Sequence, residues 1–182
     1  QAPPMSEYNA FTGDVALQSG VATFGGAWGS ERLATLGAAV GSTEWQDKSR
    51  DANNVGPTLV THDRFGNRKD AAQFHPAYHE LMALGLESGA STFGWQPENR
   101  GKPGAHVIRA ALMYLMYQLN PGVVCPITMT FAATPALESG MKGIAAGGAA
   151  RAYLDTLLQG LCTPAYDGGD KPFEGKEGKG DK

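Results

Sequence analysis

The stretch HVIRAALMYLMYQLNPGVVCPITMTFAATPAL, residues 106–137, decides the fold class, because it predicts two consecutive apolar helices. Its first half is apolar on most sides, which is typical of a helix buried among other helices. Asn120, Pro121 and Gly122 interrupt the pattern and predict the end of this first helix. We expect the second helix to begin at Pro126, because proline is favoured in the first turn of a helix and disfavoured inside one.

Three threonines and a cysteine interrupt the apolar character of the second helix. Thr128, Thr130 and Thr134 can each donate a hydrogen bond to a carbonyl oxygen one turn earlier, which satisfies a buried hydroxyl without a ligand. Cys125 directly precedes Pro126, and a helix N-terminus lowers the pKa of a nearby thiol. Because no sequence motif pairs a histidine with Cys125 as a catalytic base, we predict a buried, unreactive thiol and no nucleophile.

Helix signals recur along the rest of the chain. Leu33, Leu36 and Val40 lie at helical spacing, and residues 150–161 form another amphipathic segment. Residues 139–150 are rich in glycine and alanine, which predicts either a loop or a weak, closely packed helix. The expected boundary residues of the other helices are Asp14, Gly20, Ser30, Ser42 or Thr43, Pro76 and Gly89.

Residues 57–74 follow a different pattern. TLVTHD, residues 58–63, is rich in β-branched residues, and the following turn has Gly66 and Asn67 at its tip. No convincing strand pair is visible, so we expect an irregular extended excursion and no sheet. The sequence therefore predicts an all-α helical bundle with this short excursion around residues 57–74.

The composition bounds the classes of function. The 182 residues are 42% hydrophobic and 18% charged, as in a soluble globular chain that can bury a core. The net charge of −3 provides no global basic field for nucleic acid or an anionic membrane. No stretch approaches the ~20 apolar residues of a membrane span. The two cysteines form no disulfide framework, which favours reduced thiols and a cytoplasmic location.

No residue is identified as catalytic from these patterns, and no metal site is expected. His75 and His79 have the i, i+4 spacing that can bind a metal, but no third ligand lies nearby, so we predict structural or hydrogen-bonding roles. Residues 22–29, ATFGGAWG, lack the lysine of a phosphate loop and predict a turn. A further set either lines an acyl or cofactor pocket or belongs to the ordinary core: Met113, Tyr114, Met116 and Tyr117.

Four stretches, taken together, resemble the AidB (adaptive alkylation-response) branch of the acyl-CoA dehydrogenase superfamily. They are GSERLATLGAAVGSTE (29–44), DRFGNRKDAAQFHPAYHELM (63–82), HVIRAALMYLMYQL (106–119) and CPITMTFAATPAL (125–137). The resemblance covers roughly residues 8–165. It implies an N-terminal arm over residues 1–12 and a helical domain over 13–165. Residues 166–182 would form a flexible Gly/Lys-rich linker or tail, leading to a β-domain missing from this chain.

The resemblance also implies a function for the complete protein. Members of the superfamily bind FAD and oxidise the α,β carbon–carbon bond of acyl-CoA thioesters, usually as homotetramers. This chain ends before the β- and C-terminal domains that hold the flavin and supply the catalytic carboxylate. We therefore expect it to be a fragment or one part of a split protein, inactive alone, that partners with the remaining domains.

Two functional hypotheses follow from the resemblance. In the first, the helical domain forms one wall of the acyl and flavin cleft, through Met129, Thr130 and Phe131. In the second, the complete protein is a non-catalytic, flavin-containing protein that associates with DNA through its C-terminal part and protects it against alkylation. A weaker third alternative is a free-standing helical interaction module without flavin.

Overall fold

The computed structural model describes residues 2–3 and 5–168, which form helices and one small sheet. The elements in chain order are α1 (Val15–Thr23), the short 3₁₀ helix η1 (Ala27–Gly29), α2 (Ser30–Val40), α3 (Thr43–Asn54), β1 (Thr58–His62), β2 (Arg68–Gln73), α4 (Pro76–Ser88), α5 (Ala105–Leu119), α6 (Pro121–Met141) and α7 (Ala149–Leu161). The predicted all-α bundle with an excursion near residues 57–74 is confirmed. Residues 169–182, most of the predicted linker or tail, lie outside the described residues.

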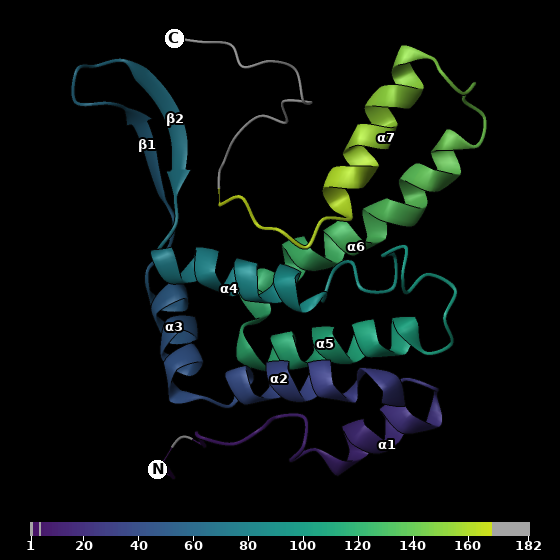
Figure 1. Cartoon of the computed structure of the whole chain (residues 1–182). Helices are drawn as coiled ribbons and strands as arrows, with labels where there is room; N and C mark the ends of the chain where they lie inside the picture. Colours follow the sequence, from purple (N-terminus) through teal and green to yellow (C-terminus); the bar gives the residue numbers. More distant parts are fainter. Residues whose placement is uncertain (1, 4, 169–182) are drawn as a thin grey trace.

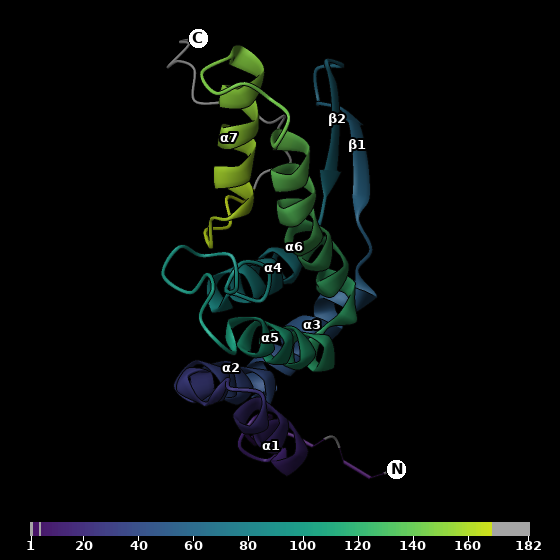
Figure 2. The ribbon, with the colours of Figure 1, turned by 90° about the vertical axis from the view of Figure 1, so that its right-hand side faces the viewer.

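The helices stack in layers, and two hairpins extend from the stack. Helices α2, α5 and α4 lie one above another, α1 lies beyond α2, and α3 runs along one end (Figure 1). The first part of α6 packs against α4 and α5, whereas the rest of α6 rises out of the stack beside α7 (Figures 1 and 2). The β1–β2 hairpin rises on the same side of the stack.

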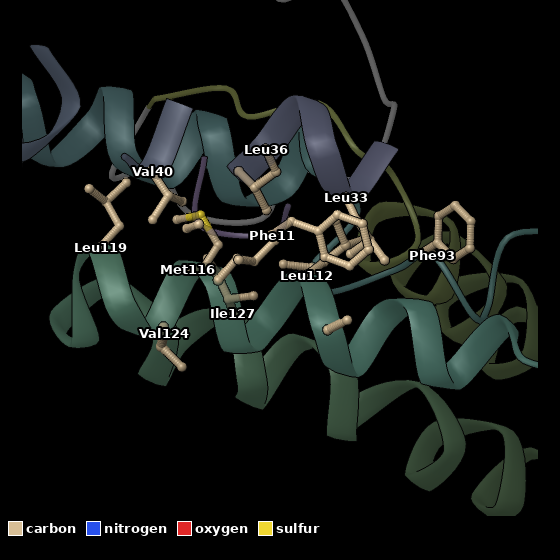
Figure 3. Close-up of a cluster of buried hydrophobic side chains, with 14 of the residues drawn as sticks. Phe11, Leu33, Leu36, Val40, Phe93, Leu112, Met116, Leu119, Val124 and Ile127 are labelled. Carbon is tan, nitrogen blue, oxygen red and sulfur yellow. The ribbon is translucent and has the colours of Figure 1, made fainter. Parts of the chain in front are cut away.

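The hydrophobic core is centred on α5. Its fully buried side chains pack between α2 on one side and α4 and α6 on the other, and Figure 3 shows Leu112 and Met116 among residues of α2. The predicted burial of α5 is only partly confirmed, because Tyr114 and Tyr117 are 49% and 61% exposed. Met116 belongs to the ordinary core. The apolar side of α7 is only half-buried, and no residue of α7 is fully buried.

The predicted excursion is more regular than expected, because its two halves pair as an antiparallel hairpin. Thr58 pairs with Gln73 and His62 pairs with Arg68, with one irregularity between Val60 and His62. The expectation that no strands pair is therefore wrong. The strands are mostly exposed, so they lack the apolar alternation that predicts a half-buried strand.

The boundaries of the first helices are partly as predicted. The side chains of Asp14 and Ser42 accept hydrogen bonds from the backbone and cap α1 and α3. Gly20 does not end α1, which continues to Thr23. Ser30 does not cap α2, because it lies inside the first turn and its hydroxyl donates to the carbonyl oxygen of Ala27.

The second helix of the opening stretch begins at Pro121, five residues before the predicted start at Pro126. Asn120 is the reason: its backbone is extended, and its side-chain oxygen accepts the N–H of Val123 at 3.2 Å. Pro121 then takes the first helical position, where its missing N–H is not needed. Pro126 and Pro135 both lie inside α6.

The three threonines of α6 have three different environments. Thr130 donates to the carbonyl oxygen of Pro126 at 3.0 Å, as predicted. Thr128 instead lies 3.8 Å from the sulfur of Met113, and Thr134, although only 1% exposed, lies 3.9 Å from the sulfur of Cys162. The prediction of a hydrogen bond one turn back therefore holds for Thr130 alone.

The N-terminal arm is packed against α2. The N–H of Ala10 donates to the carbonyl oxygen of Gly37 at 2.9 Å, and the N–H of Tyr8 donates to that of Gly41 at 3.3 Å. Neither glycine has a side chain to block this approach, and a Cβ atom added to Gly41 would lie 1.8 Å from the carbonyl oxygen of Tyr8. The missing side chains of these two glycines therefore allow the arm to pack directly on the backbone of α2.

Replacing Gly41 with alanine is expected to lower the free energy of unfolding by about 2 kcal/mol, as in other overpacked sites. Urea unfolding followed by circular dichroism measures the change. Gly20→Ala in α1 is the matched control, because nothing lies within 4 Å of a Cβ atom added there. An equal stability of the Gly41→Ala and Gly20→Ala chains would contradict the packing of the arm.

Candidate functional site

The three residues predicted to form a pocket wall lie together in the middle of α6. Met129 is 68% exposed, whereas Thr130 and Phe131 are partly buried. The hydroxyl of Thr130 is held by the carbonyl oxygen of Pro126. The exposed surface of this segment is therefore mainly that of Met129, and Phe131 extends toward the neighbouring elements.

The ring of Phe131 belongs to an aromatic cluster that joins α6 to α5 and to the segment between α4 and α5. The Trp95 ring stacks on it, with centroids 5.4 Å apart, and the Trp95 indole N–H donates to the carbonyl oxygen of Phe131 at 3.2 Å. The ring of His106 approaches both edge-on, at 4.5 Å from Trp95 and 6.0 Å from Phe131. Gly94 allows this approach, because an added Cβ atom would lie 2.4 Å from the His106 ring.

Two arginines extend this cluster. The guanidinium carbon of Arg109 lies 3.5 Å from the centroid of Phe131, and that of Arg100 lies 5.8 Å from Trp95. Arg100 also forms an ion pair with Glu138 of α6 at 2.5 Å. Burial lowers the pKa of Arg109 to about 10, because the surroundings disfavour its charged form. The middle of α6 is thus held by stacking and by two cations.

Sequence reasoning identified Phe131 but missed Trp95, His106 and Arg109. The contacts that bring them together join segments far apart in the chain, so no local pattern reveals them. One signal was visible, because Arg109 is the only charged residue between His106 and Asn120, a span that predicts a buried helix. A lone charge in such a helix needs a partner.

Cys125 is exposed, so the prediction of a buried thiol is wrong. It lies in the second turn of α6 and points away from the core side chains of Val124 and Ile127, which are buried. The other thiol, Cys162, is only partly exposed and lies near Thr134. The pattern missed this because the start of α6, and hence its buried face, was misplaced.

We expect Cys125 to react with a maleimide several times faster than Cys162 in the native chain, since only its thiol is freely accessible. Mass spectrometry of peptides after brief labelling measures both rates. In Cys125→Ser the fast phase should vanish and the slow phase should remain. Equal rates at the two thiols would contradict this arrangement.

The two histidines have the structural roles predicted for them. The Nδ1 atom of His75 accepts the N–H of Ala77 at 3.2 Å and caps α4. The Nδ1 atom of His79 lies 2.7 Å from the hydroxyl of Tyr166. Within residues 2–3 and 5–168, no group of His, Cys, Asp and Glu side chains has the arrangement of a metal site.

Two cavities of similar size are lined by residues other than those of the aromatic cluster. One, of about 670 Å³, lies between α2, the end of α4 and the following segment, with Trp28, Arg32 and Phe93 in its lining. The other, of about 650 Å³, lies where β2 meets α4, and Tyr78 and Tyr166 line it. Burial raises the pKa of both tyrosines. Tyr166, which the sequence places in the tail, thus packs against the helical stack.

The glycine-rich residues near η1 form a packed turn. A Cβ atom added to Gly29 would lie 2.5 Å from Ile108, and one added to Gly104 would lie 2.1 Å from the carbonyl oxygen of Gly25. These glycines pack against one another and against α5, so their backbone does not cradle a phosphate. The described glycine-rich residues 22–29 therefore offer no open loop for a phosphate.

Comparison with known families identifies the chain. Residues 1–167 match the family described as the adaptive response protein AidB N-terminal domain. The chain belongs to this family. It is also 39% identical over 137 residues to AidB of Escherichia coli (strain K12), an alignment that covers 75% of this chain and 25% of that protein.

Two solved structures share the fold of this AidB N-terminal domain. Caenorhabditis elegans ACDH-11, crystallised in complex with C11-CoA, matches with a TM-score of 0.75 and 19% identity, over 91% of this chain and 27% of that one. The apo form of Bd2924 matches with a TM-score of 0.73 and 22% identity, over 90% of this chain and 31% of that one. The recognition of an acyl-CoA dehydrogenase-like, AidB-type helical domain is confirmed.

The AidB N-terminal domain is a minor part of each relative. The chain spans a quarter of the length of the Escherichia coli protein and less than a third of each solved structure. The relatives therefore carry further domains, as the resemblance implied.

Among the described residues, no helix is both long enough and apolar enough to cross a bilayer.

Proposed function

We propose that this chain is the N-terminal part of an FAD-dependent acyl-CoA dehydrogenase-like flavoprotein. The complete protein would oxidise the α,β carbon–carbon bond of an acyl-CoA thioester, with the flavin as acceptor. The observation that carries the proposal is the match of residues 1–167 to the AidB N-terminal domain family. The relative ACDH-11, which shares the fold, was crystallised with C11-CoA.

The role of this chain in that protein would be to wall the acyl and flavin cleft. Met129, Thr130 and Phe131 would form the wall, with Met129 outermost because it is 68% exposed. Phe131 would hold the segment rigid, because its ring is stacked on Trp95 and covered by Arg109. A rigid apolar wall positions an acyl chain and keeps water from it. FAD would be held mainly by the further domains.

Flavin absorbance and acyl-CoA oxidation by the complete polypeptide test this function. We expect flavin bands in the purified protein and reduction of an electron-accepting dye when acyl-CoA is added. A polypeptide that contains no flavin after expression, and that takes up none when FAD is supplied, would contradict the proposal.

Replacing Met129 with alanine in the complete polypeptide is expected to raise the KM for acyl-CoA roughly tenfold, because apolar contact with the acyl chain is lost. Steady-state kinetics measure the change. Phe65→Ala, at the exposed tip of the β1–β2 hairpin, is the control and should leave KM unchanged. An unchanged KM in Met129→Ala would show that Met129 does not contact the acyl chain.

The family's description as an adaptive response protein favours a second candidate, a non-catalytic flavoprotein that protects DNA against alkylation. DNA association would come from the further domains, because this chain has a net charge of −3. Salt-dependent DNA binding by the complete polypeptide, without acyl-CoA oxidation, would support this second function. In both cases we infer a cytoplasmic homo-oligomer, which light scattering of the complete polypeptide tests.

A further inference from the structure

The side chain of Arg109 is fixed between three segments of the fold. It extends from α5, and its Nε atom donates to the carbonyl oxygen of Ala90 at 2.7 Å. Its guanidinium group lies over the ring of Phe131 in α6. These contacts leave the buried Nη2 atom without a hydrogen-bond partner, at the forked end of a guanidinium group that suits a carboxylate.

Two buried polar atoms of these neighbouring segments have no hydrogen-bond partner. Among the described residues, Arg109 Nη2 and Ser91 Oγ are the buried side-chain nitrogen and oxygen atoms that no other group satisfies. Ser91 is 0% exposed and directly follows Ala90, the residue whose carbonyl oxygen binds Arg109. Because buried polar groups are almost always paired in native proteins, these two atoms indicate a missing acceptor.

The charge of Arg109 indicates what kind of acceptor is missing. None of the ion pairs among the described residues includes Arg109, whereas Arg50, Arg100 and Arg151 each have a carboxylate partner. The Phe131 ring offsets part of the charge. A water molecule would satisfy the N–H groups but would not neutralise the rest. Charged side chains in protein interiors are rarely found without a partner of opposite charge.

We propose that Arg109 and Ser91 form a binding site for a carboxylate, which accepts hydrogen bonds from the guanidinium group and from the serine hydroxyl. The carboxylate comes either from an Asp or Glu side chain of the further domains or from a small free carboxylate. Because the guanidinium group of Arg109 also lies over the ring of Phe131, the site would couple α6 to whatever supplies the anion. It goes beyond the proposed function and does not depend on flavin or acyl-CoA.

Formate is the probe for the free-ligand source. We would titrate it against the 182-residue chain and the complete polypeptide at constant ionic strength, with chloride as the reference anion. The readouts are the ¹⁵N and ¹H side-chain NMR signals of Arg109 and the melting temperature. We expect saturable shifts of the Arg109 signals in the chain. Arg109→Met should weaken formate binding at least tenfold and Ser91→Ala roughly fivefold, since both remove donors to a charged acceptor.

Arg151→Met is the matched control, because Arg151 is a partly buried arginine already paired with Asp155. It should leave formate binding unchanged. If Arg109→Met does not fold, Ser91→Ala and the signals of the unsubstituted chain still decide the question. Flavin content and acyl-CoA oxidation enter none of these readouts, so a failure here is distinct from a failure of the proposed function.

A crystal structure of the complete polypeptide distinguishes the sources. An Asp or Glu oxygen within about 3.2 Å of Arg109 Nη2 would support the side-chain source, and formate should then shift only the isolated chain. Formate binding to both proteins would support a free carboxylate. A site that holds only ordered water, together with no saturable response to formate in either protein, would overturn the proposal.

Discussion

Replacing Asn120 with alanine is expected to lower the free energy of unfolding of the chain by about 3 kcal/mol, through the loss of a helix cap and of several buried hydrogen bonds. Asn120 is 2% exposed and lies between α5 and α6. Its Oδ1 atom accepts the N–H of Val123 at 3.2 Å. Its Nδ2 atom donates to the hydroxyl of Ser49 at 3.0 Å and to Oδ1 of Asn53 at 3.3 Å.

The effect is large because the substitution leaves other buried polar groups without a hydrogen-bond partner. The Ser49 hydroxyl donates to the carbonyl oxygen of Leu119 at 2.7 Å, so the network ties α3 to the end of α5 and the start of α6. Urea unfolding measures the loss. Asn54→Ala, at the exposed end of α3, is the control and should change stability by less than about 0.5 kcal/mol. A loss below about 1 kcal/mol in Asn120→Ala would show that water replaces the network.

The same asparagine explains why sequence reasoning misplaced the start of α6. Both Pro121 and Pro126 suit a first helical turn, and local pattern alone favours the second because proline disrupts a helix interior. The contacts of Asn120 with α3 fix its extended backbone and place Pro121 at the first helical position. A tertiary contact thus overrode the start that the local pattern favoured.

Other boundaries were predictable because they depend on neighbouring residues only. Asp14 and Ser42 bind backbone N–H groups three residues ahead, and Gly89 ends α4 with a φ of 92°, which glycine adopts readily. Pairing across the β1–β2 hairpin was missed because its strands are exposed and carry no alternating pattern. Local chemistry predicts caps and turns better than it predicts exposed pairing.

The candidate site was predictable only in part, because its contacts join segments that are far apart in the sequence. The segment Met129, Thr130 and Phe131 was singled out through its resemblance to a family. The partners of Phe131 come from residues 95, 106 and 109, which the fold brings together. The lone charge of Arg109 in an apolar helix was a visible signal. No comparable signal in the sequence marked Trp95 or His106.

Replacing Phe131 with alanine is expected to lower the free energy of unfolding by about 3 kcal/mol, as for other aromatic truncations. The substitution removes the ring on which Trp95 stacks and over which Arg109 lies. Urea unfolding measures the loss. The NMR signal of the Trp95 indole N–H, which donates to the Phe131 carbonyl oxygen, reports the local change. Phe65→Ala at the hairpin tip is the control and should be neutral.

Phe131→Leu separates packing from the interaction with Arg109. Leucine restores most of the apolar volume but offers no π face to the guanidinium group. If packing alone holds α6, this variant should recover nearly all of the stability lost in Phe131→Ala. We expect it to recover only about half, because cation–π and aromatic pairs contribute on the order of 1 kcal/mol each beyond apolar burial. Full recovery would show that Phe131 stabilises α6 through apolar packing alone. The hydrogen bond to the carbonyl oxygen of Ala90 would then be what positions Arg109.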